Sequence, residues 1–265
     1  MTDPWTTHQL DDQYPAAMLY HENSSLNRSR GPILGERIAT FTEQSMALGG
    51  HPASTEKQYP LCPQYALPRP RTSSAIERLI ARRRTRRDFS GRGVDLRQLS
   101  RVLQSAYGVT APPADRPAMP ARRACPSAGA LFPLEVYPVV HRSPDVSPGV
   151  YHYRAGGHCV EQLREGDVRQ KLEANLMGID LMPGADMAIV ITSVFERTMV
   201  KYGERGYRFI LIEVGHLAQN VCLACEAMKL NSVCLGGVHE EGVGSLLSID
   251  RRAEAVQYVI LIGTR

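Results

Sequence analysis

The sequence has little lysine and lacks any uninterrupted apolar run of the roughly 18–20 residues that a membrane span needs. Only four of its 31 basic residues are lysines, so arginine carries almost all of the net charge of +4. So mild an excess, without a concentrated basic face, does not indicate a nucleic-acid-binding protein. The shortage of long apolar runs predicts that no segment crosses a membrane.

Signals for secretion, disulfides and metals are also missing. The first residues carry acidic side chains and no apolar stretch, so a secretory signal is not expected and we predict a cytoplasmic protein. The six cysteines are scattered in apolar surroundings, which favours buried reduced thiols over a disulfide framework. Cys222 and Cys225 form a C-x-x-C, but no second Cys or His pair has zinc-like spacing, so we predict no metal site.

Two regions follow from composition. Residues 1–72 are rich in Pro, Ser, Gln and His, which predicts an N-terminal extension with one short helix near residues 35–46. Residues 73–265 predict one domain in which helices and strands interleave. The pattern has no clean βαβ repeat, and no G-x-G-x-x-G follows a strand, so we expect an α+β fold and not a dinucleotide-binding domain.

Periodicity and caps place the elements of this domain. Ser74 with Glu77 has capping-box spacing and predicts a helix toward Arg86, and Asp95 predicts a second helix that stops at Gly108. Strands are predicted over 134–141, 149–153, 158–163, 188–194, 232–238 and 255–262, and helices over 167–176, 207–228 and 240–247. The helix over 207–228 is apolar around most of its circumference, which indicates burial in the core or at a subunit interface.

An arginine cluster lies at the C-terminal end of the first of these predicted helices and in the loop that follows. Arg83, Arg84 and Arg87, with the hydroxyl of Thr85, present forked donors that match phosphate geometry. A solvated helix face and a nucleic-acid patch are alternatives. Because an anion would offset the mutual repulsion of so many arginines, we favour a phosphate cradle, with flavin mononucleotide (FMN) as a suitable ligand.

Two segments with small residues could approach a flat ligand. Pro126, Ser127, Ala128 and Gly129 precede a predicted strand, and Gly129 can adopt backbone angles that larger residues avoid. The second segment is Leu235-Gly236-Gly237, where adjacent glycines could expose amide groups. Each segment could equally be a tight connection between elements.

Lys201 and Tyr202 lie side by side before the long apolar helix. A lysine works as a general base once burial or neighbouring positive charge lowers its pKa. Arg197 and Arg205 would lie one turn away on either side of this pair if the segment is helical. A solvated lysine at a helix start is the alternative.

In this order, the motifs RRTRRDF, PSAGALFPLEVY, GVYHYRAGGH, KYGERGYRFILIEVGHLAQNVCLACEAM and CLGGV resemble the SagB-type dehydrogenases of the nitroreductase superfamily. The resemblance covers about residues 74–263. It implies a nitroreductase-like fold, with a central mostly antiparallel sheet flanked by helices, in an intertwined homodimer. It also implies that Arg83, Arg84, Thr85 and Arg87 hold the FMN phosphate and ribityl chain.

The resemblance further implies that Pro126 to Gly129 contact the flavin ring from the partner subunit, and that Leu235, Gly236 and Gly237 lie near the ring edge. Lys201 and Tyr202 would be the catalytic pair. The implied activity is oxidation of azoline rings (thiazolines or oxazolines) to azoles in a ribosomally synthesised peptide, with cyclodehydratase proteins as partners. Two alternatives stay open: an NAD(P)H-dependent nitroreductase or ene-reductase, and a non-catalytic scaffold subunit of a peptide-modifying complex. Whether Arg265 replaces the C-terminal phosphate contacts of many nitroreductases is open as well.

Overall fold

A computed structural model describes residues 13–47, 57, 60–68, 71, 74–111, 121–177, 183–251 and 253–265. The helices of this part are α2 (Pro15–Ser24), α3 (Arg30–Ala47), α4 (Ala75–Arg82), α5 (Leu96–Tyr107), α6 (Arg169–Glu173), α7 (Glu196–Tyr202), α8 (Glu204–Ala227) and α9 (Glu240–Leu247). The strands are β1 (Val109–Ala111), β2 (Arg122–Arg123), β3 (Leu134–Val140), β4 (Gly149–Arg154), β5 (Cys159–Glu165), β6 (Met187–Val194), β7 (Leu230–Leu235) and β8 (Glu254–Thr264). Short 3-10 turns are η3 (Ala128–Ala130) and η4 (Ala155–Gly157).

A six-stranded sheet in the order β5-β4-β3-β6-β8-β7 forms the centre of the fold. Every neighbouring pair is antiparallel, which confirms the expected α+β class with an antiparallel sheet. The edge strand β7 is therefore paired through one side only, with β8. No strand of the described part pairs with its other side, where the Ser232 carbonyl instead accepts the N–H of Arg86.

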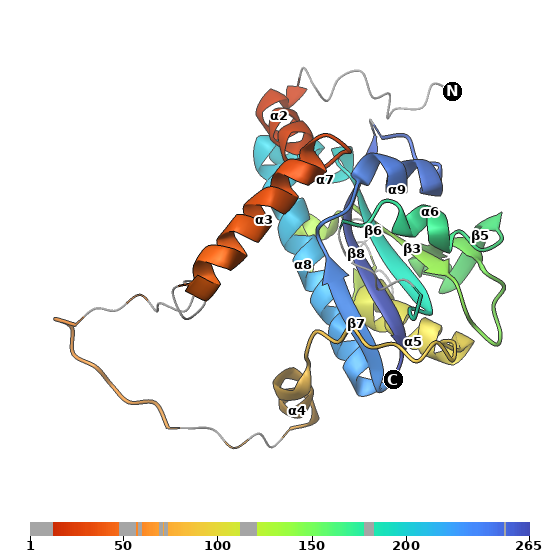
Figure 1. Cartoon of the computed structure of the whole chain (residues 1–265), viewed down its shortest axis with the longest axis horizontal. Helices are drawn as coiled ribbons and strands as arrows, with labels where there is room; N and C mark the ends of the chain where they lie inside the picture. The colour runs from red at the N-terminus through yellow and green to blue at the C-terminus, as the bar shows by residue number, and fades with distance from the viewer. Residues whose placement is uncertain are drawn as a thin grey trace.

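Helices cover both faces of this sheet (Figure 1). Successive side chains of a strand point to opposite faces, and β6 shows the consequence. Met187, Ile189 and Ile191 join the apolar layer under α5 and α8, whereas Ala188 and Val190 join the layer under α6 and α9. A strand buried on both faces reads as a continuous apolar run, as the sequence of β6 does.

The predicted capping box at Ser74 and the predicted second cap at Asp95 are both present. The Ser74 hydroxyl accepts the Glu77 backbone N–H at 3.2 Å, and the Glu77 carboxylate accepts the Ser74 N–H at 2.7 Å. Asp95 forms the same reciprocal pair with Gln98 at the start of α5. The first predicted helix nevertheless ends at Arg82, so Arg83 to Arg87 are extended chain and not its last turn.

The prediction for the N-terminal region was wrong in part. The helix expected near residues 35–46 is the end of the longer α3, which projects away from the sheet in Figure 1, and α2 was not predicted. Distant contacts stabilise α2, because the Glu204 carboxylate at the start of α8 accepts the N–H groups of Ala16 at 3.0 Å and Ala17 at 2.7 Å. A carboxylate at a helix N-terminus satisfies donors that have no partner within the helix.

The strand expected over 232–238 is displaced, since β7 ends at Leu235 and leaves Gly236 and Gly237 beyond the strand. The helix expected over 167–176 is limited to α6. Among the described residues, α8 alone has the length and apolar composition of a membrane span, contrary to the expectation from apolar runs. Of its most apolar window, 56% is buried inside the fold, as in the core helix of a soluble protein.

Candidate active site

Lys201 and Tyr202 are the last residues of α7 and lie immediately before α8. Gly203 separates the two helices with a φ of 56°, a left-handed backbone angle that glycine adopts readily. Gly206 then lets α8 approach α7 closely, because a Cβ at this position would lie 2.9 Å from the Cα of Met199. In this chain Lys201 is exposed and Tyr202 is half-buried, so the pair ends at the surface.

The predicted Pro126–Gly129 segment meets this pair. Gly129 has a φ of 62°, and a Cβ added to it would lie 2.6 Å from the Tyr202 hydroxyl and 2.8 Å from the Lys201 Nζ. Both polar groups therefore converge on a backbone position that only glycine leaves open. The Tyr202 ring meets the ring of Phe209 edge-on, at 5.1 Å between centroids. The structure thus brings together the predicted catalytic pair and the segment predicted to contact the flavin ring.

The backbone after Gly129 is strained. Ala130 and Phe132 also have positive φ, at 54° and 47°, which costs non-glycine residues free energy and occurs mostly where surrounding structure enforces it. Here the Ser127 hydroxyl accepts the Phe132 N–H at 2.9 Å and closes the turn. The Arg123 guanidinium lies 4.6 Å from the centre of the Phe132 ring.

A buried carboxyl group, that of Glu213, contacts the strained segment through Ser127. Glu213 of α8 is 2% exposed and accepts a hydrogen bond from the Tyr107 hydroxyl at 2.9 Å and another from Ser127. The Tyr107 oxygen in turn accepts the Leu134 N–H at 3.3 Å. Burial raises the pKa of Glu213, and the Ser127 and Tyr107 hydroxyls oppose that rise. The sequence did not identify Glu213, because one acid within an apolar helix gives no signal of its own.

Replacing Glu213 tests this support. In Glu213→Leu the hydroxyls of Tyr107 and Ser127 lose their acceptor, which should cost about 1–3 kcal/mol of unfolding free energy for each. Glu213→Gln keeps an oxygen acceptor of the same shape and should be much more stable than Glu213→Leu. Denaturant unfolding of both variants measures the difference, and equal stability of the two would show that the hydrogen bonds contribute nothing.

The same residue predicts a pH dependence. Its folded-state pKa lies above the usual 4.5, so the native protein holds this proton more tightly than the unfolded chain does. The contribution of Glu213 to stability is therefore present at low pH and is lost as pH rises through the folded-state pKa. Between pH about 4 and about 8, the unfolding free energy of the wild-type protein should decrease as pH rises. This decrease should be absent in Glu213→Gln. An unchanged slope in Glu213→Gln would assign the effect to other groups.

The two arginines expected beside Lys201 have other partners. Arg197 lies 2.5 Å from the Glu135 carboxylate, which also bonds His152 at 2.9 Å. Arg205 rests on the ring of Phe209, with 5.7 Å from guanidinium carbon to ring centroid. The Glu135 carboxylate therefore compensates the Arg197 charge, and Arg197 does not face Lys201 as an unpaired positive charge.

The arginine segment lies at the open edge of the sheet. The Arg86 N–H donates to the Ser232 carbonyl of β7 at 3.1 Å, which fixes the segment against the start of that strand. Arg84 and Arg87 are exposed, and no carboxylate of the described residues lies within ion-pair distance of Arg83, Arg84 or Arg87. Part of Arg84 serves the helix end, because its Nη1 donates to the carbonyls of Ala81 and Arg83.

Arg86 adds a donor that the sequence interpretation had not selected. Its Nε is buried without a hydrogen-bond partner among the described residues. A buried donor is normally paired, so an orphan within a positive, uncompensated segment fits an anionic ligand. This observation supports a phosphate cradle over a solvated helix face. Arg86 also lies beyond α4, which ends at Arg82.

The Leu235-Gly236-Gly237 segment continues the same edge. Leu235 is buried at the end of β7, whereas Gly236 is exposed, and a Cβ there would meet only the Tyr258 ring at 3.7 Å. The Gly237 carbonyl accepts the Met177 N–H at 2.8 Å, which turns the chain away from the sheet. Ser232 and Gly236 are about 13 Å apart at strand spacing. The arginines and the glycines thus lie along one edge, as a ligand with a phosphate arm and a ring requires.

These residues form two groups that α8 separates. Lys201 and Tyr202 precede its first residue, whereas Arg82 lies 3.8 Å from Glu226 in its last turn. A helix of 24 residues is about 36 Å long. Figure 1 shows α7 and α4 at opposite ends of α8. We call Arg83–Arg87 and Leu235–Gly237 the edge group, and Pro126–Gly129 with Lys201 and Tyr202 the junction group. The arginines of the edge group lie about 30 Å along α8 from the junction group of the same chain.

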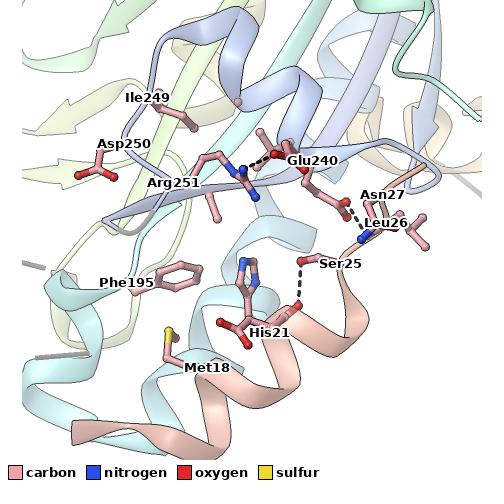
Figure 2. Close-up of a pocket in the computed structure, with 15 residues that line it drawn as sticks. Met18, His21, Ser25, Leu26, Asn27, Phe195, Glu240, Ile249, Asp250 and Arg251 are labelled. Carbon is pink, nitrogen blue, oxygen red and sulfur yellow. Dashed lines mark hydrogen bonds and ion pairs between the residues drawn. The ribbon is translucent and has the colours of Figure 1, made fainter. Parts of the chain in front are cut away.

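A cavity of about 700 Å³ opens elsewhere, between α2 and the region of α9 (Figure 2). His21 and Phe195 face it from one side, and Glu240 and Arg251 from the other. Burial, with help from the Arg251 charge, lowers the pKa of His21, whose Nδ1 lies 3.1 Å from the Tyr207 hydroxyl. None of the predicted site residues lines this cavity.

Arg265, whose contribution to a phosphate site the sequence left open, is paired within this chain. Its guanidinium lies 2.7 Å from the Glu226 carboxylate and donates to Asn231 at 3.0 Å. These contacts join Arg265 to the last turn of α8 and to the start of β7.

Comparison with known proteins connects these groups to a family. The model of the nitroreductase family matches residues 80–264. A Methanocaldococcus jannaschii protein named as a nitroreductase, MJ1384, is 33% identical over 174 residues, covering 66% of this chain and 84% of that protein. The Escherichia coli microcin B17-processing protein McbC is 28% identical over 64% of this chain and 62% of its own length. The Rhizobium leguminosarum trifolitoxin-processing protein TfxB is 30% identical over 53% of this chain and 39% of its own length.

Solved structures show the same fold. One is a chain of the E. coli microcin synthetase McbBCD complex with truncated pro-MccB17 bound, with a TM-score of 0.59 at 21% identity over 92% of this chain and 99% of that one. Another is a Desulfovibrio desulfuricans protein described as a nitroreductase in complex with FMN, with a TM-score of 0.50 at 18% identity over 72% of this chain and 87% of that one.

Proposed function

Because this chain belongs to the nitroreductase family, we propose that it is an FMN-dependent dehydrogenase that oxidises azoline rings to azoles in a ribosomally synthesised peptide. The observation that carries the proposal is the convergence of Lys201 and Tyr202 on Gly129, which offers a base and a hydroxyl beside a ring-binding segment. The names of McbC and TfxB, which process microcin B17 and trifolitoxin, support a peptide substrate.

FMN suits the edge group. Arg83, Arg84, Arg87 and the Thr85 hydroxyl would hold its phosphate, with the orphan Arg86 Nε as a further donor. Gly236 leaves backbone accessible where the ring edge would lie. When bound, FMN supplies a hydride acceptor.

A second copy of the chain would complete the site. The arginines that would hold the phosphate lie about 30 Å along α8 from the Lys201–Tyr202 pair of the same chain, too far for both to act on one flavin. In a two-fold dimer, the edge group of one chain can face the junction group of the other, and the same contact then forms twice. We therefore propose a homodimer with two shared sites. Exposed apolar side chains on α8, Leu211 at 38% and Ile212 at 50%, are consistent with contact to another chain.

Lys201 acts as the base in this proposal. Aromatising an azoline removes a hydride from one ring carbon and a proton from its neighbour. The Lys201 amine takes that proton, and the Tyr202 hydroxyl orients the ring or polarises it. Both groups lie beside the Gly129 backbone, and the network through Ser127 and Glu213 maintains that backbone. Such positioning accounts for much of the rate that an enzyme can provide.

Mass spectrometry tests the proposal. Azoline-containing peptide incubated in air with the yellow protein should lose two hydrogens per ring, and a peptide of unchanged mass would contradict it. Partner proteins such as a cyclodehydratase are part of the proposal, since the McbBCD structure is of a complex.

An NAD(P)H-dependent nitroreductase is the second candidate, because MJ1384 is named as one. That activity would use the edge group but has no special need of the Lys-Tyr pair. Turnover of NAD(P)H with a nitroaromatic that is undiminished in Lys201→Ala, together with no oxidation of azolines by the wild-type protein, would favour it.

A further inference from the structure

Two cysteines that are twelve residues apart in sequence come into contact between α8 and β7. Cys222 of α8 and Cys234 of β7 are both free thiols, and their sulfur atoms are 3.5 Å apart. Cys225, the other half of the C-x-x-C, is completely buried one turn further along α8. The thiol pair that the structure presents therefore joins a helix to the edge strand, and the C-x-x-C spacing alone did not indicate it.

The surroundings favour a thiolate on Cys222. A hydrogen bond from the Cys234 thiol lowers the pKa of Cys222 most, burial opposes this, and the Ser232 hydroxyl and the Arg83 charge lower it further. The same contact, with burial, raises the pKa of Cys234, which Tyr258 opposes. Burial and the neighbouring Cys222 raise the pKa of Cys225. One sulfur can thus act as nucleophile while its neighbour still carries a proton.

We propose that Cys222 and Cys234 form an oxidation site at which hydrogen peroxide converts the two thiols into a disulfide linking α8 to β7. The Cys222 thiolate attacks one peroxide oxygen and the O–O bond breaks, which gives a sulfenic acid and a hydroxide that takes a proton to become water. The Cys234 sulfur then attacks the Cys222 sulfur. An S–S bond forms, the S–O bond breaks, and the departing hydroxide leaves as water with the Cys234 proton. Two thiols are oxidised and one peroxide is reduced to two waters.

The location gives the disulfide a consequence. The Arg83 charge acts on Cys222, and Cys234 directly precedes Leu235, so the disulfide would form next to both parts of the edge group. The effect on cofactor binding rests on the proposed function, in which this edge holds FMN. Dioxygen would be the oxidant that regenerates the flavin in air, and peroxide is its two-electron product. The pair would then respond to the enzyme's own by-product.

Thiol mapping of the full-length protein tests the oxidation site without any flavin. After treatment with hydrogen peroxide, digestion should release a linked peptide containing Cys222 and Cys234, and reductant should remove it. The linked peptide should persist in Cys225→Ala, the matched control. In Cys234→Ser it should be absent, and Cys222 should accumulate as a sulfenic acid that dimedone traps.

The exposed Cys62 reports that the oxidant has reached the protein. Modification of Cys62 with Cys222 and Cys234 still reduced would overturn the proposal, as would a link from Cys222 to Cys225. A second measurement compares FMN affinity of the reduced and linked proteins, and we expect weaker binding by the linked form. A linked peptide with unchanged FMN affinity would leave the oxidation site in place and refute its coupling to the cofactor.

Discussion

Lys201→Ala should lower the rate of azoline oxidation by about 10²–10⁴-fold, the usual effect of losing a general base. The side chain is exposed in the chain, at the end of α7, so its loss should leave the fold intact. In the proposed site the edge group supplies the phosphate contacts, so the variant should still bind FMN. Rates come from mass spectrometry of the peptide, and binding comes from flavin absorbance of the same preparation.

Two further variants sharpen this prediction. Lys201→Arg keeps the positive charge but cannot act as a base near neutral pH, so it should be as inactive as Lys201→Ala. Lys171→Ala removes an exposed lysine of α6 and should oxidise the peptide at the wild-type rate. Full activity in Lys201→Arg would mean that charge alone is needed and would exclude the proton-transfer role.

Arg84→Ala combined with Arg87→Ala should weaken FMN binding by about 10²–10⁴-fold. Each charge-assisted hydrogen bond contributes about 1.5–3 kcal/mol, and about 1.4 kcal/mol corresponds to a factor of ten in affinity. Both side chains are exposed, and no carboxylate of the described part pairs with them, so an anion is the partner they lack. Titration of the apoprotein with FMN gives the dissociation constant.

A matched control removes the same charge elsewhere. Arg97 and Arg101 lie exposed on α5, away from the edge strand, and their double alanine variant should bind FMN like the wild-type protein. If both double variants bind equally, whether tightly or weakly, then the arginine segment does not hold the phosphate.

Local signals allowed much of the fold to be predicted. Ser74 with Glu77 forms the capping box that their spacing predicts, and Asp95 caps α5 as predicted. The continuous apolar run of β6 reflects burial on both faces of the sheet, and the apolar circumference of α8 reflects burial around most of the helix. The α2 helix was missed because its N-terminal donors are satisfied by Glu204, a contact that no local pattern records.

The sequence allowed individual candidate residues to be selected, but not their arrangement in space. Motif order identified Lys201, Tyr202 and Gly129, but their convergence depends on how the strained turn meets the α7–α8 junction. Glu213 and the Cys222–Cys234 contact depend on side chains that approach from different elements. The separation of edge group and junction group follows from the length of α8 and from which residues lie at its two ends.

The central claim is that each active site combines the edge group of one chain with the junction group of another. Complementation tests it most directly. Lys201→Ala and the Arg84→Ala, Arg87→Ala double variant, each inactive alone, are co-expressed with different tags, and the heterodimer is purified through both. One of its two sites is then intact, so we predict about half of the wild-type rate per dimer. A heterodimer that contains both chains and yet shows no azoline oxidation would contradict the shared site.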